Sequence, residues 1–221
     1  MIDGIRFKVC GLTTLVDAEF ADRVGADFLG FILYPKSPRY LSLRQYVDMA
    51  RRLPEGRKRV AVMVEPSRDE LNAAVAASFD RFQIHFRLST PLASVRAWSE
   101  QVGRDRLWLA PKLPSDEPMP EMLFPLARTF LMDTFHREGF GGSGRVGNLG
   151  RFRDLQLKNP EHDWILAGGI GPENVGSVLA ESAAKTVDVN SGVEAAPGIK
   201  DHNKMKQLVL AVHRARTGKP G

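Results

Sequence analysis

The strongest constraint on the fold is a regular alternation of short apolar segments with longer amphipathic ones along the 221-residue chain. Short apolar runs are typical of buried parallel strands, and apolar residues at helical spacing are typical of helices that cover a sheet. Strand–helix units repeated eight times in a chain of this length predict an α/β fold, a closed (β/α)8 TIM barrel. The segments expected as strands are Arg6–Cys10, Phe28–Leu33, Arg59–Val64, Arg81–Phe86, Leu107–Ala110, Thr129–Asp133, Trp164–Ala167 and Lys185–Val189.

The intervening segments are expected to form helices, and several carry signals of a helix end. Ser67 followed by Glu70 is a capping box, and Ser42 can cap a helix that runs to about Leu53. Proline suits the first helical position, so another helix is expected to open on Pro172-Glu173. The remaining helices are expected at Thr14–Val24, Pro91–Val102, Leu149–Lys158 and His202–Arg216, with only a short, irregular helix within Ser115–Ala127.

The length fits one domain, expected as a single barrel over residues 1–216 with a disordered tail at 217–221. An open doubly wound sheet would also alternate strands and helices. Its first turn normally carries a dinucleotide-binding glycine pattern, which is absent from this sequence, so the closed barrel is favoured.

Composition and charge exclude several classes of function. The single cysteine excludes an internal disulfide and favours a reducing compartment, so a cytoplasmic location is expected. The start, Met1-Ile-Asp-Gly4, lacks signal-peptide features, and no apolar run approaches the ~18–20 residues that span a membrane. The net charge of +5 comes from scattered basic residues without stacked aromatics among them, which argues against nucleic acid as a partner. A phosphorylated small molecule is the expected partner, and both a monomer and a homodimer remain open.

Active residues of such barrels lie where strands end and the following loops begin. Cys10 is expected to end the first strand, His85 the fourth and Asp133 the sixth. Asp188 stands near the end of the eighth. These polar side chains are therefore expected at one mouth of the barrel.

Glycine clusters follow three of the expected strands. Gly168-Gly169 and Ser191-Gly192 come after the seventh and eighth, where barrel loops commonly bind a phosphate through backbone N–H groups. Simple tight turns are the structural alternative for both. Gly142 belongs to a flexible loop, Gly141-Gly-Ser-Gly144, that follows Asp133 and can close over it.

Each candidate side chain also has a structural alternative. Cys10 is either a small buried filler or a catalytic thiol whose thiolate a nearby phosphate site and helix dipole would favour. Asp133 is either a cap or an acid with a raised pKa. Arg39, in a loop stiffened by prolines, either binds a carboxylate or is solvated. His85 is either a core histidine or a supporting polar group, and no grouping has metal-ligand spacing, so no metal is inferred.

The chain resembles the phosphoribosylanthranilate isomerase family over nearly its whole length, through five collinear motifs. These are Lys8-Val-Cys-Gly-Leu-Thr13, Gly25-Ala-Asp-Phe-Leu-Gly-Phe-Ile-Leu-Tyr-Pro-Lys-Ser-Pro-Arg-Tyr40, Gly141-Gly-Ser-Gly144, Leu166-Ala-Gly-Gly-Ile-Gly-Pro-Glu-Asn-Val175 and Val187-Asp-Val-Asn-Ser-Gly-Val-Glu-Ala-Ala-Pro-Gly-Ile-Lys-Asp201.

The resemblance implies a (β/α)8 barrel of tryptophan biosynthesis that performs an Amadori rearrangement of N-(5-phosphoribosyl)anthranilate without a cofactor. It places the general base on Cys10 and the general acid on Asp133. It also implies that Arg39 meets the anthranilate carboxylate.

Two places depart from the family pattern. Phe86 follows His85 where the family usually has glycine, and it is expected to narrow or reshape the mouth after the fourth strand. Arg145-Val-Gly-Asn-Leu149 replaces a stretch usually like Lys-Thr-Phe-Asp-Trp, behind the acid. Both changes bear on efficiency and substrate range more than on reaction class.

Three rivals remain from the sequence. The first is a different isomerase or an aldolase of phosphosugars on the same barrel; an aldolase would need a metal or a Schiff-base lysine, and no lysine is expected to end a strand. A nucleic-acid binder is another, and it rests on the net charge of +5 alone. A non-catalytic or altered-specificity phosphosugar-binding paralogue would bind a phosphorylated ligand without this turnover.

Overall fold

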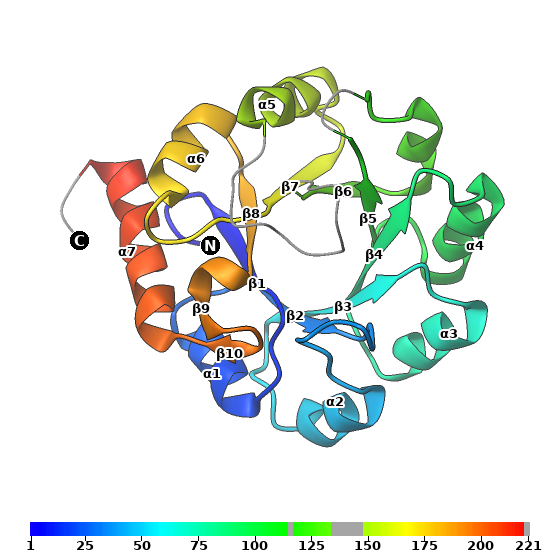
Figure 1. Ribbon diagram of the computed structural model, residues 1–221, viewed down its shortest axis with the longest axis horizontal. Helices are drawn as coiled ribbons and strands as arrows, with labels where there is room; N and C mark the ends of the chain where they lie inside the picture. The colour runs from blue at the N-terminus through cyan, green and yellow to red at the C-terminus, as the bar shows by residue number, and fades with distance from the viewer. Residues whose placement is uncertain (115–116, 134–147, 219–221) are drawn as a thin grey trace.

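The computed structural model describes residues 1–114, 117–133 and 148–218 of the chain. Eight parallel strands form a closed barrel in the order β1 to β8, and helices surround it (Figure 1). This confirms the predicted (β/α)8 barrel.

The strands of the barrel are β1 (Arg6–Val9), β2 (Phe28–Ile32), β3 (Lys58–Val64), β4 (Arg81–Arg87), β5 (Leu107–Lys112), β6 (Thr129–Met132), β7 (Asp163–Ala167) and β8 (Thr186–Val189). The helices are α1 (Leu15–Arg23), α2 (Leu43–Ala50), α3 (Arg68–Ala76), α4 (Leu92–Val102), α5 (Leu149–Lys158), α6 (Val175–Ser182) and α7 (His202–Thr217), with short 3-10 helices η1 (Glu121–Leu126) and η2 (Ser191–Val193). A small hairpin of β9 (Glu194–Ala196) and β10 (Ile199–Lys200), which the sequence pattern did not predict, follows β8.

The barrel closes between its first and last strands. β1 pairs with β8 in a register that sets Lys8 beside Asp188 and Val9 beside Val189. Because side chains alternate along a strand, one set faces the barrel interior and the other faces the helices. The interior contains a compact apolar cluster: Cys10, Ile32, Val60, Val62, Trp108, Ala110, Leu131, Ile165 and Ala167.

The larger apolar core lies between the strands and the helices, and Phe86 belongs to it. Its ring is buried and makes an edge contact with Trp98 of α4, with ring centroids 5.7 Å apart. The prediction that Phe86 narrows the mouth is therefore wrong, because the side chain points out of the barrel. The extra aromatic surface stabilises the contact between β4 and α4 instead.

Helix ends follow the local sequence, with three differences from the prediction. The capping box of Ser67 and Glu70 is present, and Ser42 forms another with Gln45. Helix α2 ends at Ala50 rather than near Leu53. Helix α6 begins at Val175 rather than on Pro172-Glu173, because the Asn174 side chain binds the preceding glycine turn instead. Helix α7 includes Thr217, and residues 219–221 lie outside the described part of the chain.

The strand ends show one further difference. β5 continues through Pro111 to end at Lys112, and β10 ends at Lys200. The expectation that no lysine ends a strand is therefore wrong, and the absence of a strand-end lysine does not separate this chain from an aldolase.

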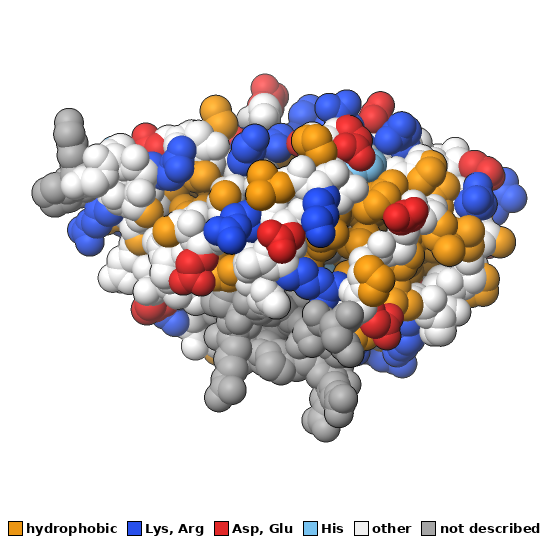
Figure 2. Space-filling model, turned by 90° about the horizontal axis from the view of Figure 1, so that it is seen from above, with side chains coloured by type: hydrophobic (Ala, Val, Ile, Leu, Met, Phe, Trp, Pro, Cys, Tyr) orange, Lys and Arg blue, Asp and Glu red, His pale blue; other side chains and the backbone are white. Residues whose placement is uncertain are grey.

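Basic and acidic side chains intermingle with apolar ones on the face shown in Figure 2, without a continuous basic stripe there. No helix within the described ranges has both the length and the apolar character needed to cross a lipid bilayer.

Candidate active site

Cys10 follows the last residue of β1 and is buried, with its side chain in the apolar interior cluster. Gly11, next to it, has a positive φ of 69°, which favours glycine. A Cβ at Gly11 would lie 2.8 Å from Asn190 Oδ1 and 2.9 Å from Arg39 Cδ. The loops after β1, β2 and β8 therefore meet beside Cys10.

The glycine loops after β7 and β8 are in direct contact with each other. A Cβ at Gly192 would lie 2.1 Å from the carbonyl oxygen of Ile170, closer than any side chain could fit. Gly168 and Gly169 have φ values of 98° and 63°, so both positions in the loop after β7 favour glycine. Asn174 braces the first loop by accepting from Gly171 N at 2.9 Å and donating to the Gly169 carbonyl at 2.8 Å.

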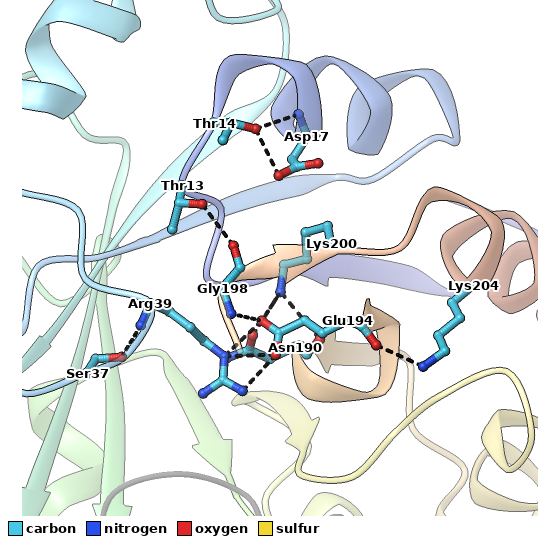
Figure 3. Close-up of polar contacts among 10 residues, drawn as sticks. All are labelled: Thr13, Thr14, Asp17, Ser37, Arg39, Asn190, Glu194, Gly198, Lys200 and Lys204. Atoms are coloured by element: carbon cyan, nitrogen blue, oxygen red, sulfur yellow. Dashed lines mark hydrogen bonds and ion pairs between the residues drawn. The ribbon is translucent and has the colours of Figure 1, made fainter. Parts of the chain in front are cut away.

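Arg39 lies in a cluster of charged side chains next to this loop pair (Figure 3). Its Nε and Nη2 donate to the two oxygens of Glu194 at 2.8 and 2.7 Å. Lys200 Nζ donates to Glu194 Oε1 at 2.9 Å and to Asn190 Oδ1 at 2.9 Å. The expected carboxylate-binding arginine is thus already held by a carboxylate of the protein.

A second ion pair lies inside the barrel, below Cys10. Lys8 Nζ donates to Asp188 Oδ2 at 2.8 Å, and the lysine side chain is fully buried. Burial lowers the pKa of Lys8, but the combined effect of Asp188 and Cys10 leaves that pKa raised. Asp188 Oδ1 is buried and has no hydrogen-bond partner among the described residues.

The environment of Cys10 does not favour the thiolate in the absence of substrate. Burial, followed by the negative charge of Asp188, raises the pKa of the thiol, although Lys8 and Lys200 act to lower it. Burial therefore works against the expected thiolate, because the sulfur is removed from water.

His85 lies within β4, two residues before its end, on the same strand face as Gln83. Gln83 Nε2 donates to His85 Nε2 at 2.7 Å. Burial, with the nearby Lys8 charge, lowers the pKa of His85 to about 4. The imidazole is therefore neutral near pH 7, with one nitrogen serving as an acceptor.

Asp133 follows the last residue of β6 and is partly buried. Leu131, two positions earlier, belongs to the interior cluster with Cys10. By strand alternation, the face of Leu131 is also that of Asp133. Gly142 lies outside the described residues.

Three residues of the two ion-pair networks had no role in the sequence interpretation: Lys8, Glu194 and Lys200. A signal for Lys8 was present, because it precedes Cys10 by two residues in a strand and so shares its face. Glu194 and Lys200 are brought together by the β9–β10 hairpin, which has no simple alternating pattern. Within the described residues, no group of three or more His, Cys, Asp or Glu side chains could hold a metal ion.

A closed barrel with its polar side chains and glycine turns gathered after the strand ends defines the class of (β/α)8-barrel enzymes. A family model described as N-(5'-phosphoribosyl)anthranilate (PRA) isomerase matches residues 7–211. The chain belongs to this family.

Relatives named N-(5'-phosphoribosyl)anthranilate isomerase match nearly the whole chain. The protein of Magnetococcus marinus is 34% identical over 215 residues, covering 97% of this chain and 98% of the relative. That of Syntrophus aciditrophicus is 37% identical over 218 residues, covering 94% and 86% respectively.

Solved structures agree with this family. The phosphoribosyl anthranilate isomerase of Thermotoga maritima superposes with a TM-score of 0.77 at 32% identity, covering 97% of this chain and all of that one, 100%. Another phosphoribosyl anthranilate isomerase, solved with reduced 1-(o-carboxyphenylamino)-1-deoxyribulose 5-phosphate, has a TM-score of 0.75 at 30% identity, with coverage of 97% and 100%.

Proposed function

We propose that this chain isomerises N-(5-phosphoribosyl)anthranilate to 1-(2-carboxyphenylamino)-1-deoxyribulose 5-phosphate in tryptophan biosynthesis, with Cys10 as general base and Asp133 as general acid. The family assignment supports the reaction class. The position of Cys10 among the loops that follow the strands supports its assignment as the general base.

The acid step comes first. Asp133 protonates the furanose ring oxygen, the bond from that oxygen to C1 breaks, and the nitrogen lone pair forms an iminium with C1. The iminium makes the C2 proton acidic, because the electrons left on C2 can delocalise to nitrogen. General acid–base groups of this kind typically contribute ~100- to 10,000-fold each.

The base step follows. Cys10, as thiolate, removes the C2 proton, and the C2 electrons form the C1–C2 double bond of an enolamine. Tautomerisation moves the hydroxyl proton to C1 and gives the C2 ketone. The base needs a pKa near the working pH, so a bound substrate and nearby cations must offset the burial of this thiol.

The other predicted residues bind the substrate in this proposal. The backbone N–H groups of the Gly168-Gly169 and Ser191-Gly192 loops hold the phosphate, and their tight mutual contact pre-organises them. Arg39, oriented by Glu194, meets the anthranilate carboxylate. Asp188 Oδ1, a buried acceptor, receives a substrate hydroxyl, and the neutral His85 supports the sugar.

The phosphorylated small molecule is the partner in this proposal, and no protein partner is needed for the chemistry. A catalytic thiol works only while reduced, so we expect the enzyme to act in the cytoplasm as a monomer or homodimer.

Complementation tests the function, and two variants test the assignment. Expression of the chain is expected to restore growth without tryptophan to a strain that lacks the isomerase. Cys10→Ser and Asp133→Asn are each expected to lower kcat by at least about 100-fold and leave the folded barrel intact. Growth rescue by both variants at the wild-type rate, with undiminished kcat, would reject these roles. Binding of the substrate without turnover by the unaltered chain would favour the non-catalytic paralogue.

A further inference from the structure

The buried lysine on β1 has no role in the reaction as described so far. Lys8 and Cys10 are two positions apart along one strand direction, so both side chains face the barrel interior. An ammonium ion in such surroundings is costly even when it is paired, and an apolar pair of similar volume is often as stable. The Lys8–Asp188 pair is therefore poorly explained by stability alone.

The neighbouring strand leaves room for the ammonium beside Cys10. A Cβ at Gly30 of β2 would lie 2.8 Å from Lys8 Cε, 3.1 Å from Lys8 Nζ and 3.1 Å from Cys10 Cα. The end of the lysine side chain and the backbone of the cysteine thus flank the same small space. A glycine at this position allows the ammonium to lie in the same layer of the barrel as the thiol.

The charges around Cys10 are not balanced. Lys8, Lys200 and Arg39 are cations that interact with Cys10, and Asp188 and Glu194 are the carboxylates paired with them. Among these five groups, the positive charges exceed the negative ones by one when the thiol is neutral. Two further titratable groups face the thiol, His85 of β4 and Asp133 at the end of β6. His85 is neutral.

We propose that Lys8 is a positioning residue whose ammonium, held in place by Asp188, is the counter-ion that stabilises the Cys10 thiolate. This inference rests on the proposed function for its catalytic meaning. Asp188 fixes the lysine on one side, and the space at Gly30 admits it on the other. Burial and the charge of Asp188 raise the pKa of Cys10, whereas the nearby Lys8 ammonium lowers it.

The proton balance is simple. The thiol gives its proton to a solvent base when the thiolate forms, and the thiolate later takes the C2 proton of the substrate. Lys8 keeps its own proton throughout, because a raised pKa holds it as ammonium. The lysine therefore contributes its positive charge, keeps its hydrogen bond to Asp188 and transfers no proton.

The single cysteine of the chain makes the thiolate directly observable. In protein labelled with carbon-13 at the cysteine Cβ, one resonance reports the ionisation of Cys10 as the pH is raised. The double variant Lys8→Met/Asp188→Asn replaces the ion pair with neutral groups of similar size, so the fold is kept without an unpaired buried charge. Its titration midpoint is expected to lie about one unit or more above that of the single variant Asp188→Asn, which keeps Lys8, and this is a tenfold loss of thiolate at a given pH.

The single variant Asp188→Asn is the reference for this comparison. It keeps the ammonium and removes the negative charge, so the midpoint of Cys10 is expected to fall. Midpoints that coincide in the two variants would overturn the proposal, because Lys8 would then be purely structural.

A measurement on the unaltered protein covers the case in which the double variant fails to fold. With nitrogen-15-labelled lysine, the Nζ resonance of Lys8 is expected to shift with the same midpoint as the Cys10 carbon. A Lys8 resonance whose chemical shift does not change as the Cys10 thiol titrates would contradict the counter-ion role.

Neither titration requires substrate or turnover, so a failure of the counter-ion role can be distinguished from a failure of the proposed isomerase function. Linked titrations of Lys8 and Cys10 in a protein without isomerase activity would support the counter-ion role and count against the proposed function. In an active enzyme, kcat of the double variant at pH 7 is expected to be at least tenfold below that of Asp188→Asn, with its ascending pH limb moved upward together with the thiol midpoint.

Discussion

The guanidinium of Arg39 is held by both carboxylate oxygens of Glu194, with Nη2 2.7 Å from Oε2 and Nε 2.8 Å from Oε1. Glu194 begins the β9–β10 hairpin, so a segment that follows the last barrel strand orients a side chain from the loop after the second strand. Lys200, from the same hairpin, also donates to Oε1 of this carboxylate. The rotamer of Arg39 is therefore already set, as its proposed role in binding the substrate carboxylate requires.

Loosening this arginine is expected to weaken substrate binding more than chemistry. Glu194→Gln removes the charge that holds Arg39 and offers one acceptor oxygen instead of two. Hydrogen bonds to charged groups contribute about 1.5–3 kcal/mol, so KM is expected to rise about tenfold or more. Steady-state kinetics checks this, with the exposed Glu181→Gln on α6 as a matched control that changes nothing. A KM equal to that of the control would mean that Glu194 does not position Arg39.

The contact between the two glycine loops predicts a strong effect of one methyl group. Gly192→Ala would place its Cβ 2.1 Å from Ile170 O, so the loops after β7 and β8 must separate. The expected result is a higher KM and a lower melting temperature. Gly176→Ala is the control, because it lies in α6 with 3.8 Å to Ala215 Cβ and should stabilise the protein by about 0.5–1 kcal/mol. Unchanged KM for Gly192→Ala would exclude these loops as the phosphate site.

The lowered pKa of His85 predicts that the protein loses stability in mild acid. Its pKa in the folded protein is lowered to about 4, whereas the unfolded chain protonates near 6.5. The unfolded state therefore binds a proton first as the pH falls, and the stability present above pH 6.5 declines toward pH 4 by up to about 3 kcal/mol. Urea unfolding at pH 7 and pH 5 measures this. His85→Gln should show a smaller decline over that interval, and an identical decline would assign it to other groups.

The variant Gly30→Ala tests how tightly the barrel holds the Lys8 ammonium. The new methyl group of Gly30→Ala would lie 2.8 Å from Lys8 Cε, so the lysine must move away from its place beside Cys10. A lower kcat is expected at pH 7, with recovery at higher pH, where solvent alone forms the thiolate. The pH profile of kcat is the measurement. A profile that matches the unaltered enzyme would show that the lysine tolerates the methyl group without leaving the thiol.

The alternation of segments was sufficient for the barrel and for the places of Cys10, Asp133 and the glycine loops, since each follows a strand whose apolar run is visible in the sequence. The orientation of Phe86 was missed although alternation gives it once His85 is taken to face inward, because neighbours on a strand face opposite sides. A strand register is set by pairing across the barrel, and one residue of difference reverses the face of every side chain.

The electrostatics of the site were the least predictable part. Lys8 and Asp188 are far apart in the chain and become partners only where β1 closes onto β8. The state of the Cys10 thiol depends on its burial and on the charges that this closure brings together, and residue type alone gives neither.

The pairing of β1 with β8 also has a consequence for how this chain is made. Lys8 leaves the ribosome 180 residues before Asp188, so its ammonium has no permanent partner during that interval. We expect it to remain hydrated on a strand that is still unpaired at the edge that will meet β8, where a charge opposes the addition of another nascent chain. The lysine that ends up sealed within the finished barrel is therefore expected to oppose aggregation of the incomplete one.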